Sequence, residues 1–377
     1  MKYKLEEIVD VTMGQSPKSM YYNTERKGYP FLQGNRTFGF KYPTFDTYTT
    51  VMTKSAKAGD VIMSVRAPVG DINITPIDMC LGRGVCSLRM KNGNQEFLFY
   101  MMKYYIPYLL KKESGTVFGS VNRNDINGLE VDIPEDVQTQ KKIARYLEMI
   151  DDKIELNNKI NENLLEQAQT IFAQEFLNRV SIPNNWKKGS LLDIADYLNG
   201  LAMQKFRPSE DEIGLPVLKI KELRQGYCDP HSEFCSPSIK PAYIIQDGDV
   251  IFSWSGSLLV DFWCGGTCGL NQHLFKVTSQ KYDKWFYYAW TKHHLDRFIA
   301  VAADKATTMG HIKREELAKA EVLIPNNKDY DRIGALFQPI YDLIIANRIE
   351  NKKLAKTRDT LLPKLMTGEL DVSSLDI

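Results

Sequence analysis

The feature that most constrains this chain is a long stretch near its middle, roughly residues 137–178, that contains neither glycine nor proline. Nothing in it therefore interrupts a helix. At about 1.5 Å per residue such a helix spans roughly 60 Å and needs a partner to cover its apolar stripe. Apolar side chains interrupted by two asparagines recur there in steps of four and three, the spacing of a heptad seam: Ile143, Leu147, Ile150, Ile154, Asn157, Asn161, Leu164, Ala168 and Ile171.

A second stretch near the carboxyl end has the same rhythm, displaced by about 190 positions. Its asparagines coincide with those of the first stretch, so that Asn157 matches Asn347 and Asn161 matches Asn351. Asparagine in an apolar seam fixes register, because each amide needs an amide opposite it. We expect an antiparallel two-helix coiled coil with a pseudo-two-fold axis near Asn157 and Asn347. The alternative is two ordinary amphipathic helices in separate cores. The second seam comprises Ile333, Phe337, Ile340, Ile344, Asn347, Asn351, Leu354, Arg358 and Leu361.

The remainder of the chain is also an internal repeat. LEEIVDVTMG, which begins at Leu5, corresponds to LLDIADYLNG, which begins at Leu191, and GDVIMS at Gly59 corresponds to GDVIFS at Gly248. Strand and helix patterns alternate in both halves, which predicts an α/β (α+β) fold with two similar globular domains. We expect one globular domain over residues 1–136, a long helix over 137–180, a second globular domain over 181–328, and a long helix with a tail over 329–377.

Each half shows the same order of expected elements. A short amphipathic segment ends at Gly14 or Gly200, which resembles a helix C-cap. Strands are expected over residues 30–33 and 217–220, after each Gly-Asp pair, and over residues 86–90 and 273–277. Aromatic helices are expected over residues 96–110 and 284–299, and their rings are best explained as core. A last strand ends at Pro134 or Pro325 before each long helix.

Composition excludes several classes of protein. The 377 residues are 43% hydrophobic and 25% charged, with a formal net charge of +1, which suits a globular chain without broad affinity for nucleic acid. No apolar run is long enough for a membrane helix, and the amino terminus does not resemble a signal peptide, so we expect a cytoplasmic protein. The six cysteines include no CxxC pair. Cys264, Cys268 and His273 have a faint resemblance to metal ligands, but we expect reduced thiols and no metal.

Motifs for chemistry are missing. There is no GxxxxGK[ST] loop, no GxGxxG after a strand, no GxSxG and no HExxH, and none of the five histidines has an obvious nucleophile partner. An Asn-Pro-Pro-aromatic segment is also absent, so the chain lacks an adenine methyltransferase core. Together these absences favour a binding protein over an enzyme.

Polar side chains in loops that differ between the halves are the remaining candidates. Arg, Lys, Asn and Gln read guanine and adenine edges bidentately, while Ser, Thr and small-residue loops suit contacts to phosphate. Taken singly, each is better explained as a solvated loop residue. The candidates in the first half are Gln33, Asn35, Arg36, Arg66, Arg83, Ser120, Asn122 and Arg123. Those in the second half are Lys219, Lys221, Arg224, Asn271, Gln272, Thr307, Thr308, His311 and Lys313.

Two similar domains joined by stiff helices suit a ligand with two separated half-sites, which on DNA lie about one turn, or roughly 34 Å, apart. The chain resembles the specificity subunit of type I restriction–modification systems. The resemblance is carried by the order of domains and helices, the GDVI segments at Gly59 and Gly248, Leu270-Asn271-Gln272, and above all the tail LLPKLMTGELDVS from Leu361. The acidic-Gln segment that usually opens each helix is degenerate here, which leaves the helix starts uncertain by a few residues.

The resemblance implies a non-catalytic subunit with two target recognition domains, each reading one half of a bipartite, asymmetric DNA sequence. It implies that the two helices space these domains and dock two methyltransferase subunits. S-adenosylmethionine, ATP and Mg are then expected in partner subunits, which include the restriction and translocation subunits, and no cofactor is expected in this chain. DNA binding by the chain alone is expected to be weak, because its net charge is small.

Phe172 and Phe176 fall beside the first seam. They are either an exposed docking face for a methyltransferase or part of a core, with equal weight. Two other functions stay open: a non-catalytic coiled-coil scaffold that binds two protein partners, and an enzyme with an unrecognised site.

Overall fold

The computed structural model describes residues 1–111, 119–304 and 312–372. The chain divides into two compact units, Met1–Glu155 with Leu354–Ile377 as unit 1, and Leu156–Lys353 as unit 2. The long helices α4 (Val137–Phe172) and α10 (Asn327–Met366) each contribute to both units. A single π-helical turn, Ala173–Leu177, follows α4, and α10 begins two residues before the expected start of the second long helix.

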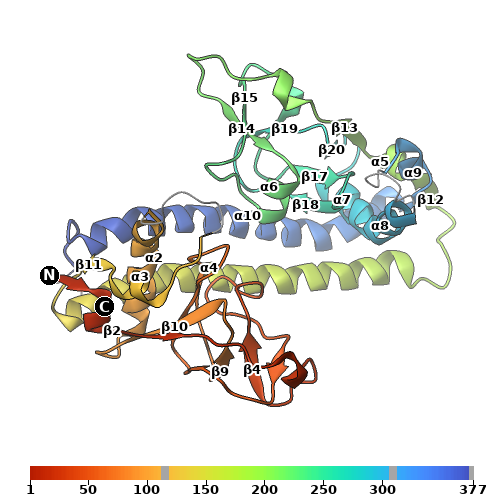
Figure 1. Ribbon diagram of the computed structural model, residues 1–377. Helices are drawn as coiled ribbons and strands as arrows, with labels where there is room; N and C mark the ends of the chain where they lie inside the picture. Colours follow the sequence, from red (N-terminus) through yellow and green to blue (C-terminus); the bar gives the residue numbers. More distant parts are fainter. Residues whose placement is uncertain (112–118, 305–311, 373–377) are drawn as a thin grey trace. The chain divides into compact units, whose positions relative to one another are not determined.

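The globular part of unit 1 contains β-sheets, three α-helices and a short 3-10 helix, Ser19–Tyr21, among the described residues (Figure 1). Strands β2, β10, β7 and β8 form an antiparallel sheet in that order, and β3, β5, β4, β9 and β6 form a second sheet in which β4 and β9 are parallel. Strand β1 pairs with β11. The elements are β1 (Lys2–Lys4), α1 (Leu5–Ile8), β2 (Val9–Met13), β3 (Tyr22–Asn23), β4 (Tyr29–Leu32), β5 (Tyr48–Thr49), β6 (Ser55–Ala56), β7 (Val61–Ser64), β8 (Ile72–Ile74), β9 (Met79–Leu81), β10 (Val85–Met90), α2 (Gln95–Lys111), α3 (Arg123–Asn127) and β11 (Glu130–Asp132).

Unit 2 repeats this plan. Strands β13, β20, β17 and β18 form the antiparallel sheet, β15, β14, β19 and β16 form the second sheet, and β12 pairs with β21. The elements are β12 (Lys187–Ser190), α5 (Leu191–Ile194), β13 (Asp196–Asn199), β14 (Leu215–Leu218), α6 (Ile220–Gln225), β15 (Phe234–Cys235), β16 (Ile244–Ile245), β17 (Val250–Ser253), β18 (Leu259–Phe262), β19 (Cys268–Leu270), β20 (Leu274–Thr278), α7 (Lys284–His293), α8 (Leu295–Asp304), α9 (Arg314–Ala318) and β21 (Glu321–Ile324).

The internal repeat extends to individual backbone hydrogen bonds. The Val121 N–H donates to the Val65 carbonyl at 3.1 Å, and the Ile312 N–H donates to the Trp254 carbonyl at 3.0 Å. The turns before β7 and β17 also match, because Gly59 and Gly248 have φ angles of +84° and +87°. Only glycine adopts such angles without strain. The α/β (α+β) fold with two similar domains is therefore confirmed.

Gly14 and Gly200 are not helix C-caps, so that prediction is wrong. Both follow a strand, β2 or β13, rather than a helix. A Cβ on Gly14 would lie 2.1 Å from the Gly82 carbonyl oxygen, and one on Gly200 would lie 2.2 Å from the Asn271 carbonyl oxygen. Close approach of two backbone segments, rather than a left-handed φ angle, is what requires glycine at both positions.

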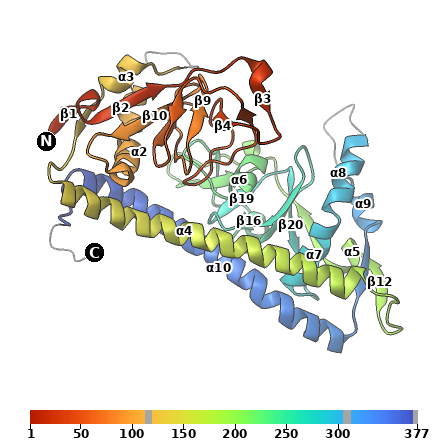
Figure 2. The same ribbon diagram turned by 90° about the horizontal axis from the view of Figure 1, so that it is seen from below.

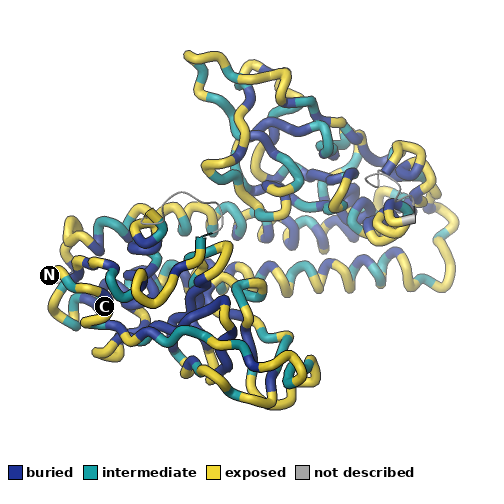
Figure 3. Tube along the Cα trace, in the orientation of Figure 1, coloured by how far each residue is buried: buried dark blue, intermediate teal, exposed yellow. Residues whose placement is uncertain are grey.

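The long helices pair antiparallel within each unit. In unit 1 the amino-terminal part of α4 lies beside the carboxyl-terminal part of α10, and in unit 2 the other two parts lie side by side (Figures 1 and 2). All the expected seam positions are buried or half-buried, and buried residues alternate with exposed ones along both helices (Figure 3). The expected aromatic helices are also core: Phe97 and Tyr100 of α2 are buried in unit 1, and Trp285 and Phe286 of α7 are buried in unit 2. The second of these helices ends at His293, and α8 is separate.

Candidate nucleic-acid interface

Four loops converge at one edge of the sheets of unit 1. The Gln33 carbonyl accepts the Gly84 N–H at 3.0 Å, the Gly84 carbonyl accepts the Val65 N–H at 2.9 Å, and the Val65 carbonyl accepts the Val121 N–H at 3.1 Å. These bonds join the loops that follow β4, β9 and β7 to the segment that precedes α3. Segments that are distant in sequence therefore form one continuous surface.

The structure brings together all the predicted binding residues of the first half. They lie on the four converging loops, and every one of them is exposed except Asn35, which is half-buried. That these side chains bind DNA stays a prediction. The loop after β4 carries Gln33, Asn35 and Arg36, the loop after β7 carries Arg66, the loop after β9 carries Arg83, and the segment before α3 carries Ser120 and Asn122, while Arg123 is the first residue of α3.

Two glycines that the sequence reasoning missed allow this convergence. A Cβ on Gly82 would lie 2.6 Å from the Gln33 Cα, and one on Gly84 would lie 2.3 Å from the Gln33 carbonyl oxygen. Any side chain at either position would push the loop after β9 away from the loop after β4. The Gly-Arg-Gly sequence that places Arg83 between them is the signal that could have identified both residues.

The guanidinium groups on these loops differ in their pairing. One guanidinium nitrogen of Arg36 donates to both carboxylate oxygens of Asp46, at 2.8 and 2.7 Å, and this hydrogen bonding lowers the pKa of the Asp46 carboxyl. Among the described residues, no carboxylate lies within ion-pair distance of Arg66, Arg83 or Arg123. Three exposed, uncompensated cations on adjoining loops favour an anionic ligand.

Two amides on these loops already have partners. The Asn122 side-chain oxygen caps α3 by accepting the N–H groups of Asn124 and Asp125 at 2.8 and 3.1 Å. The Asn35 amide donates to Asp71 at 2.5 Å. For Asn122 the NH₂ group is therefore the part left to contact a base or a phosphate.

Unit 2 has the equivalent loops. The Asn271 N–H donates to the Leu218 carbonyl at 3.2 Å, which joins the loop after β19 to the loop after β14. The Trp254 ring lies 6.2 Å from the His273 ring, and the Trp254 carbonyl accepts the Ile312 N–H. Of the predicted residues, Lys219 follows β14, Asn271 and Gln272 follow β19, and Lys313 precedes α9. Lys221 and Arg224 lie on α6 rather than in a loop, so their prediction as loop residues is wrong. Thr307, Thr308 and His311 lie outside the described residues.

The side chains on the unit 2 loops form a different electrostatic pattern. Lys219 pairs with Glu233 at 2.5 Å and Lys221 pairs with Asp229 at 2.7 Å. The hydrogen bond from Lys221 lowers the pKa of Asp229 to about 2, and the same bond raises the pKa of Lys221. Asn271 is buried, and its side-chain oxygen accepts the His273 N–H at 3.2 Å, so it braces its own loop. The two edges therefore share a backbone plan but present different groups.

The four predicted register asparagines lie together in unit 2. Asn347 donates to Asn161 at 2.9 Å, and Asn157 donates to Asn351 at 2.8 Å. The residue number rises by four along α4 as it falls by four along α10, as an antiparallel pairing requires. The network also includes Asn158 and Glu350, which the sequence reasoning missed. That these amides fix the register stays a prediction.

Phe172 and Phe176 form core rather than a docking face. They are only 7% and 3% exposed, and their rings lie 5.0 and 5.2 Å from the ring of Trp290. Since both rings are largely covered within unit 2, they are core side chains rather than an exposed docking face. The large apolar side chains that unit 2 does expose on its long helices include Leu156 of α4 and Leu336 and Leu343 of α10.

Within the part of the chain that the structure describes, no cluster of three or more metal-binding side chains occurs. The cysteines are free, and burial raises the pKa of Cys264 to about 11, which keeps its thiol protonated at neutral pH. No described helix combines the length and the hydropathy needed to span a membrane.

Comparison with known proteins places this architecture in a family. The model of the type I restriction modification DNA specificity domain matches residues 1–166 and 183–356. The MjaIX type I restriction enzyme specificity subunit of Methanocaldococcus jannaschii is 24% identical over 99% of this chain and 94% of its own length. A protein of the same organism named as the MjaX specificity subunit is 38% identical, over 44% of this chain and 39% of its own length.

A solved structure shows the same fold. The crystal structure of the type I restriction–modification S subunit from M. genitalium matches 97% of this chain and 96% of its own chain, with a TM-score of 0.61 and 14% sequence identity. The family model matches both halves of the chain, and each half contains one set of converging loops. The chain is therefore a member of the type I restriction–modification DNA specificity family, with two specificity domains.

Proposed function

We propose that this chain reads a bipartite, asymmetric DNA sequence, with each specificity domain contacting one half. The observation that carries this proposal is the convergence of polar and cationic loops at an equivalent edge of each unit. The bond from the Val121 N–H to the Val65 carbonyl is repeated as the bond from the Ile312 N–H to the Trp254 carbonyl, and the strand order is repeated as well, so both domains offer a similar platform. The side chains on the platform are not repeated, so the two halves of the target differ in sequence.

The chemistry of the side chains supports direct readout. Arginine contacts guanine bidentately, and asparagine and glutamine contact adenine. Unit 1 offers Gln33 and the guanidinium groups of Arg66, Arg83 and Arg123, which have no carboxylate partner among the described residues, while unit 2 offers Gln272 and lysines that already pair with carboxylates. Guanidinium groups also bind phosphate, which positions a domain without reading sequence.

The two long helices set the spacing between the half-sites and dock two methyltransferase subunits. Their seam positions are buried or half-buried, whereas other positions on both helices are exposed and can contact a partner. Leu336 and Leu343 of α10 are 43% and 44% exposed and lie seven residues apart, which places them on one face. Replacing both with aspartate should weaken methyltransferase binding. Unchanged binding would reject this face.

The chain supplies recognition and no catalysis. S-adenosylmethionine serves the methyltransferase subunits, and ATP and Mg serve the restriction and translocation subunits. The support is that the family matched here is a DNA specificity family, and that its named relatives are specificity subunits. With a formal net charge of only +1, the chain depends on its partners for much of the phosphate contact.

The test is a methylation map of the host genome, with the chain intact and with its gene deleted. Loss of methyladenine from one split, asymmetric motif on deletion is the expected result. The host methyltransferase must be active with other specificity subunits for the comparison to be decisive. If it is active and the methylation map is the same in both strains, the chain is not the sequence reader. Binding of two protein ligands by the globular domains would then favour a coiled-coil scaffold.

A further inference from the structure

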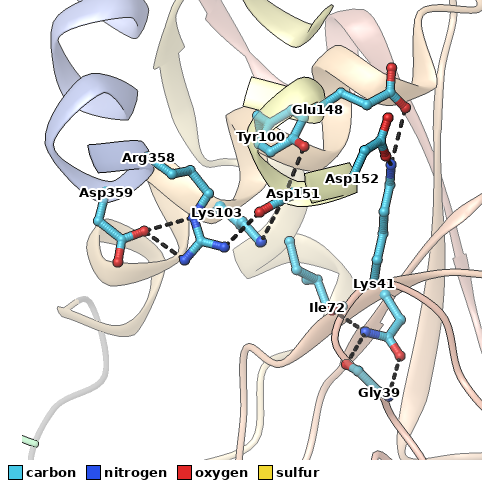
Figure 4. Close-up of polar contacts among 11 residues, drawn as sticks. Gly39, Lys41, Ile72, Tyr100, Lys103, Glu148, Asp151, Asp152, Arg358 and Asp359 are labelled. Atoms are coloured by element: carbon cyan, nitrogen blue, oxygen red, sulfur yellow. Dashed lines mark hydrogen bonds and ion pairs between the residues drawn. The ribbon is translucent and has the colours of Figure 1, made fainter. Parts of the chain in front are cut away.

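A buried lysine connects one recognition loop of unit 1 to its long helix. Lys41 is 4% exposed, and its ammonium lies 3.0 Å from a Glu148 carboxylate oxygen and 3.6 Å from one of Asp152. Glu148 and Asp152 are one turn apart on α4, so they present two carboxylates to the same cation. Figure 4 shows the Lys41 side chain extending toward both.

Lys41 lies in a loop that is folded back on itself, residues 35–46. The Phe38 N–H donates to the Asn35 carbonyl at 3.0 Å, and the Thr44 N–H donates to the Thr37 carbonyl at 2.9 Å. The ion pair between Arg36 and Asp46 closes its base. The candidate base-reading residues Asn35 and Arg36 are therefore at the base of a loop whose tip carries Lys41.

The tip itself makes several polar contacts. Asn73 of β8 is 1% exposed, accepts the Gly39 N–H at 2.9 Å and donates to the Gly39 carbonyl at 3.0 Å. The Lys41 carbonyl accepts the Ile74 N–H at 2.9 Å. A surface cavity of about 410 Å³ lies where the loop approaches α2, lined by Phe38, Gly39 and Lys103 among others. Phe38 and Phe45, which flank the tip, pack against a hydrophobic cluster that includes Leu32. Apolar packing therefore anchors the two arms of the loop, while the hydrogen bonds and the ion pairs of Lys41 hold the tip between them.

The helix face that receives Lys41 is itself fixed. Asp151 of α4 is buried and bonds to the Tyr100 hydroxyl at 2.9 Å and to Arg358 at 2.8 Å, with Lys103 at 3.7 Å (Figure 4). Burial lowers the pKa of Lys103. Since α2 and α10 both hold Asp151, its neighbour Asp152 and the preceding turn have a defined position. The ion pair of Lys41 is therefore made with a fixed partner.

Stability is a poor explanation for burying Lys41. The desolvation of a buried ion pair offsets most of its Coulomb attraction, so such pairs often add little to folding free energy. Burial alone would lower the pKa of Lys41, but the hydrogen bond from Lys41 to Glu148 and the charges of Glu148 and Asp152 raise it above its ordinary value. The lysine therefore stays charged, and the pair gives a specific geometry that a neutral contact would not.

Unit 2 has an ion pair of reversed polarity at a related position. Arg348 of α10 donates to Asp261 of β18 at 2.7 Å, and β18 is the counterpart of β8 in the repeat. In unit 1 the domain supplies the cation and the helix supplies the anions, whereas in unit 2 the helix supplies the cation. Both domains are thus held to a long helix by charge, through unrelated residues.

We propose that Lys41, through Glu148 and Asp152, is a positioning residue that fixes loop 35–46 and so determines how accurately the first specificity domain reads its half-site. This inference rests on the proposed function, because it concerns the accuracy of the same DNA readout. Lys41 itself is buried and does not contact DNA. It acts by holding Asn35 and Arg36 in place.

The experiment uses the complex assembled with its methyltransferase subunits, and measures methylation of the cognate site and of sites with one base changed in either half. Lys41→Met removes the cation, and Glu148→Gln with Asp152→Asn removes the anions. Lys57→Met is the matched control, because Lys57 forms an exposed ion pair with Asp78 in the same domain. The melting temperature of each variant is measured in parallel.

Both loop variants should lose roughly tenfold in discrimination at one half-site, the scale of one well-placed base contact. Discrimination at the other half-site and in Lys57→Met should be unchanged. The inference is overturned if Lys41→Met folds and discriminates like the parent at both half-sites. If Lys41→Met does not fold, the same criterion applies to the variant with Glu148→Gln and Asp152→Asn. An equal loss at both half-sites also overturns the inference. A parent complex that methylates no split site instead rejects the proposed function.

Discussion

Replacing Arg66, Arg83 and Arg123 together with glutamine tests how the first domain contacts DNA. The three guanidinium groups are exposed and have no carboxylate partner among the described residues. No internal ion pair is therefore broken when they bind phosphate or lost when they are replaced. Glutamine keeps a polar side chain, so the loops should remain folded and solvated.

The magnitude follows from counterion release. Each phosphate contact contributes about 0.9 to the slope of log affinity against log salt, which at 0.1 M salt corresponds to about 1.2 kcal/mol. Three contacts give a slope change of about 2.7 and an affinity loss of roughly 500-fold at that salt concentration. If one of the three arginines contacts a base instead of a phosphate, the slope change is smaller, and replacing that arginine also relaxes the sequence preference.

The assay is fluorescence anisotropy of a labelled duplex carrying the cognate site, titrated with the methyltransferase complex between 0.05 and 0.2 M salt, a range of about fourfold in which the slope is well defined. Lys2→Gln with Lys4→Gln is the control, because both lysines are exposed on β1, away from the converging loops. The control should leave the slope unchanged. A triple variant with the slope, affinity and sequence preference of the parent would refute the assignment of this edge as the DNA interface.

Three further outcomes are expected. Asn157→Leu should leave the helical content intact but weaken methyltransferase binding, because the Asn351 side-chain oxygen loses its donor at a cost of about 1–3 kcal/mol. Identical partner binding would reject the register role. Arg358→Met should destabilise unit 1 by about 3 kcal/mol by leaving buried Asp151 short of a cation. Adding Asp151→Asn to Arg358→Met should restore much of the lost free energy of unfolding, measured by urea titration followed by circular dichroism. Burial lowers the pKa of His294 to about 4, below its unfolded value, so the unfolded chain binds more protons and stability should fall as pH drops from about 6.5 toward 4. The fall is at most on the order of 3 kcal/mol, and His294→Gln should flatten this part of the pH profile.

Much of the fold follows from the sequence because its signals are local and repeated. The seam from Ile143 to Ile171 predicts a long helix, and its match with the seam from Ile333 to Leu361 predicts a partner. Two copies of one pattern also reinforce each weak strand signal. The strand after Gly59 and the strand after Gly248 are each short, but their shared Gly-Asp turn identifies both.

Long-range backbone contacts explain the errors. Gly14 ends a short amphipathic segment, which suggested a C-cap, but what requires glycine there is the Gly82 carbonyl oxygen, 2.1 Å from where its Cβ would lie. Phe172 and Phe176 lie beside the seam, and nothing local shows that Trp290, more than 100 positions away, covers them. The sequence shows which loop residues have side chains able to bind DNA. It does not show which of them form ion pairs, because Asp46, Glu233 and Asp229 reach them only through tertiary folding.

The most direct test of the central claim is to exchange residues 1–136 for the corresponding segment of a relative that directs methylation to a different target, and then to map genomic methyladenine. The account predicts that one half of the split motif changes to that of the donor, while the other half stays the same. A motif that changes in both halves, or in neither while methylation persists, would contradict the assignment of one half-site to each domain.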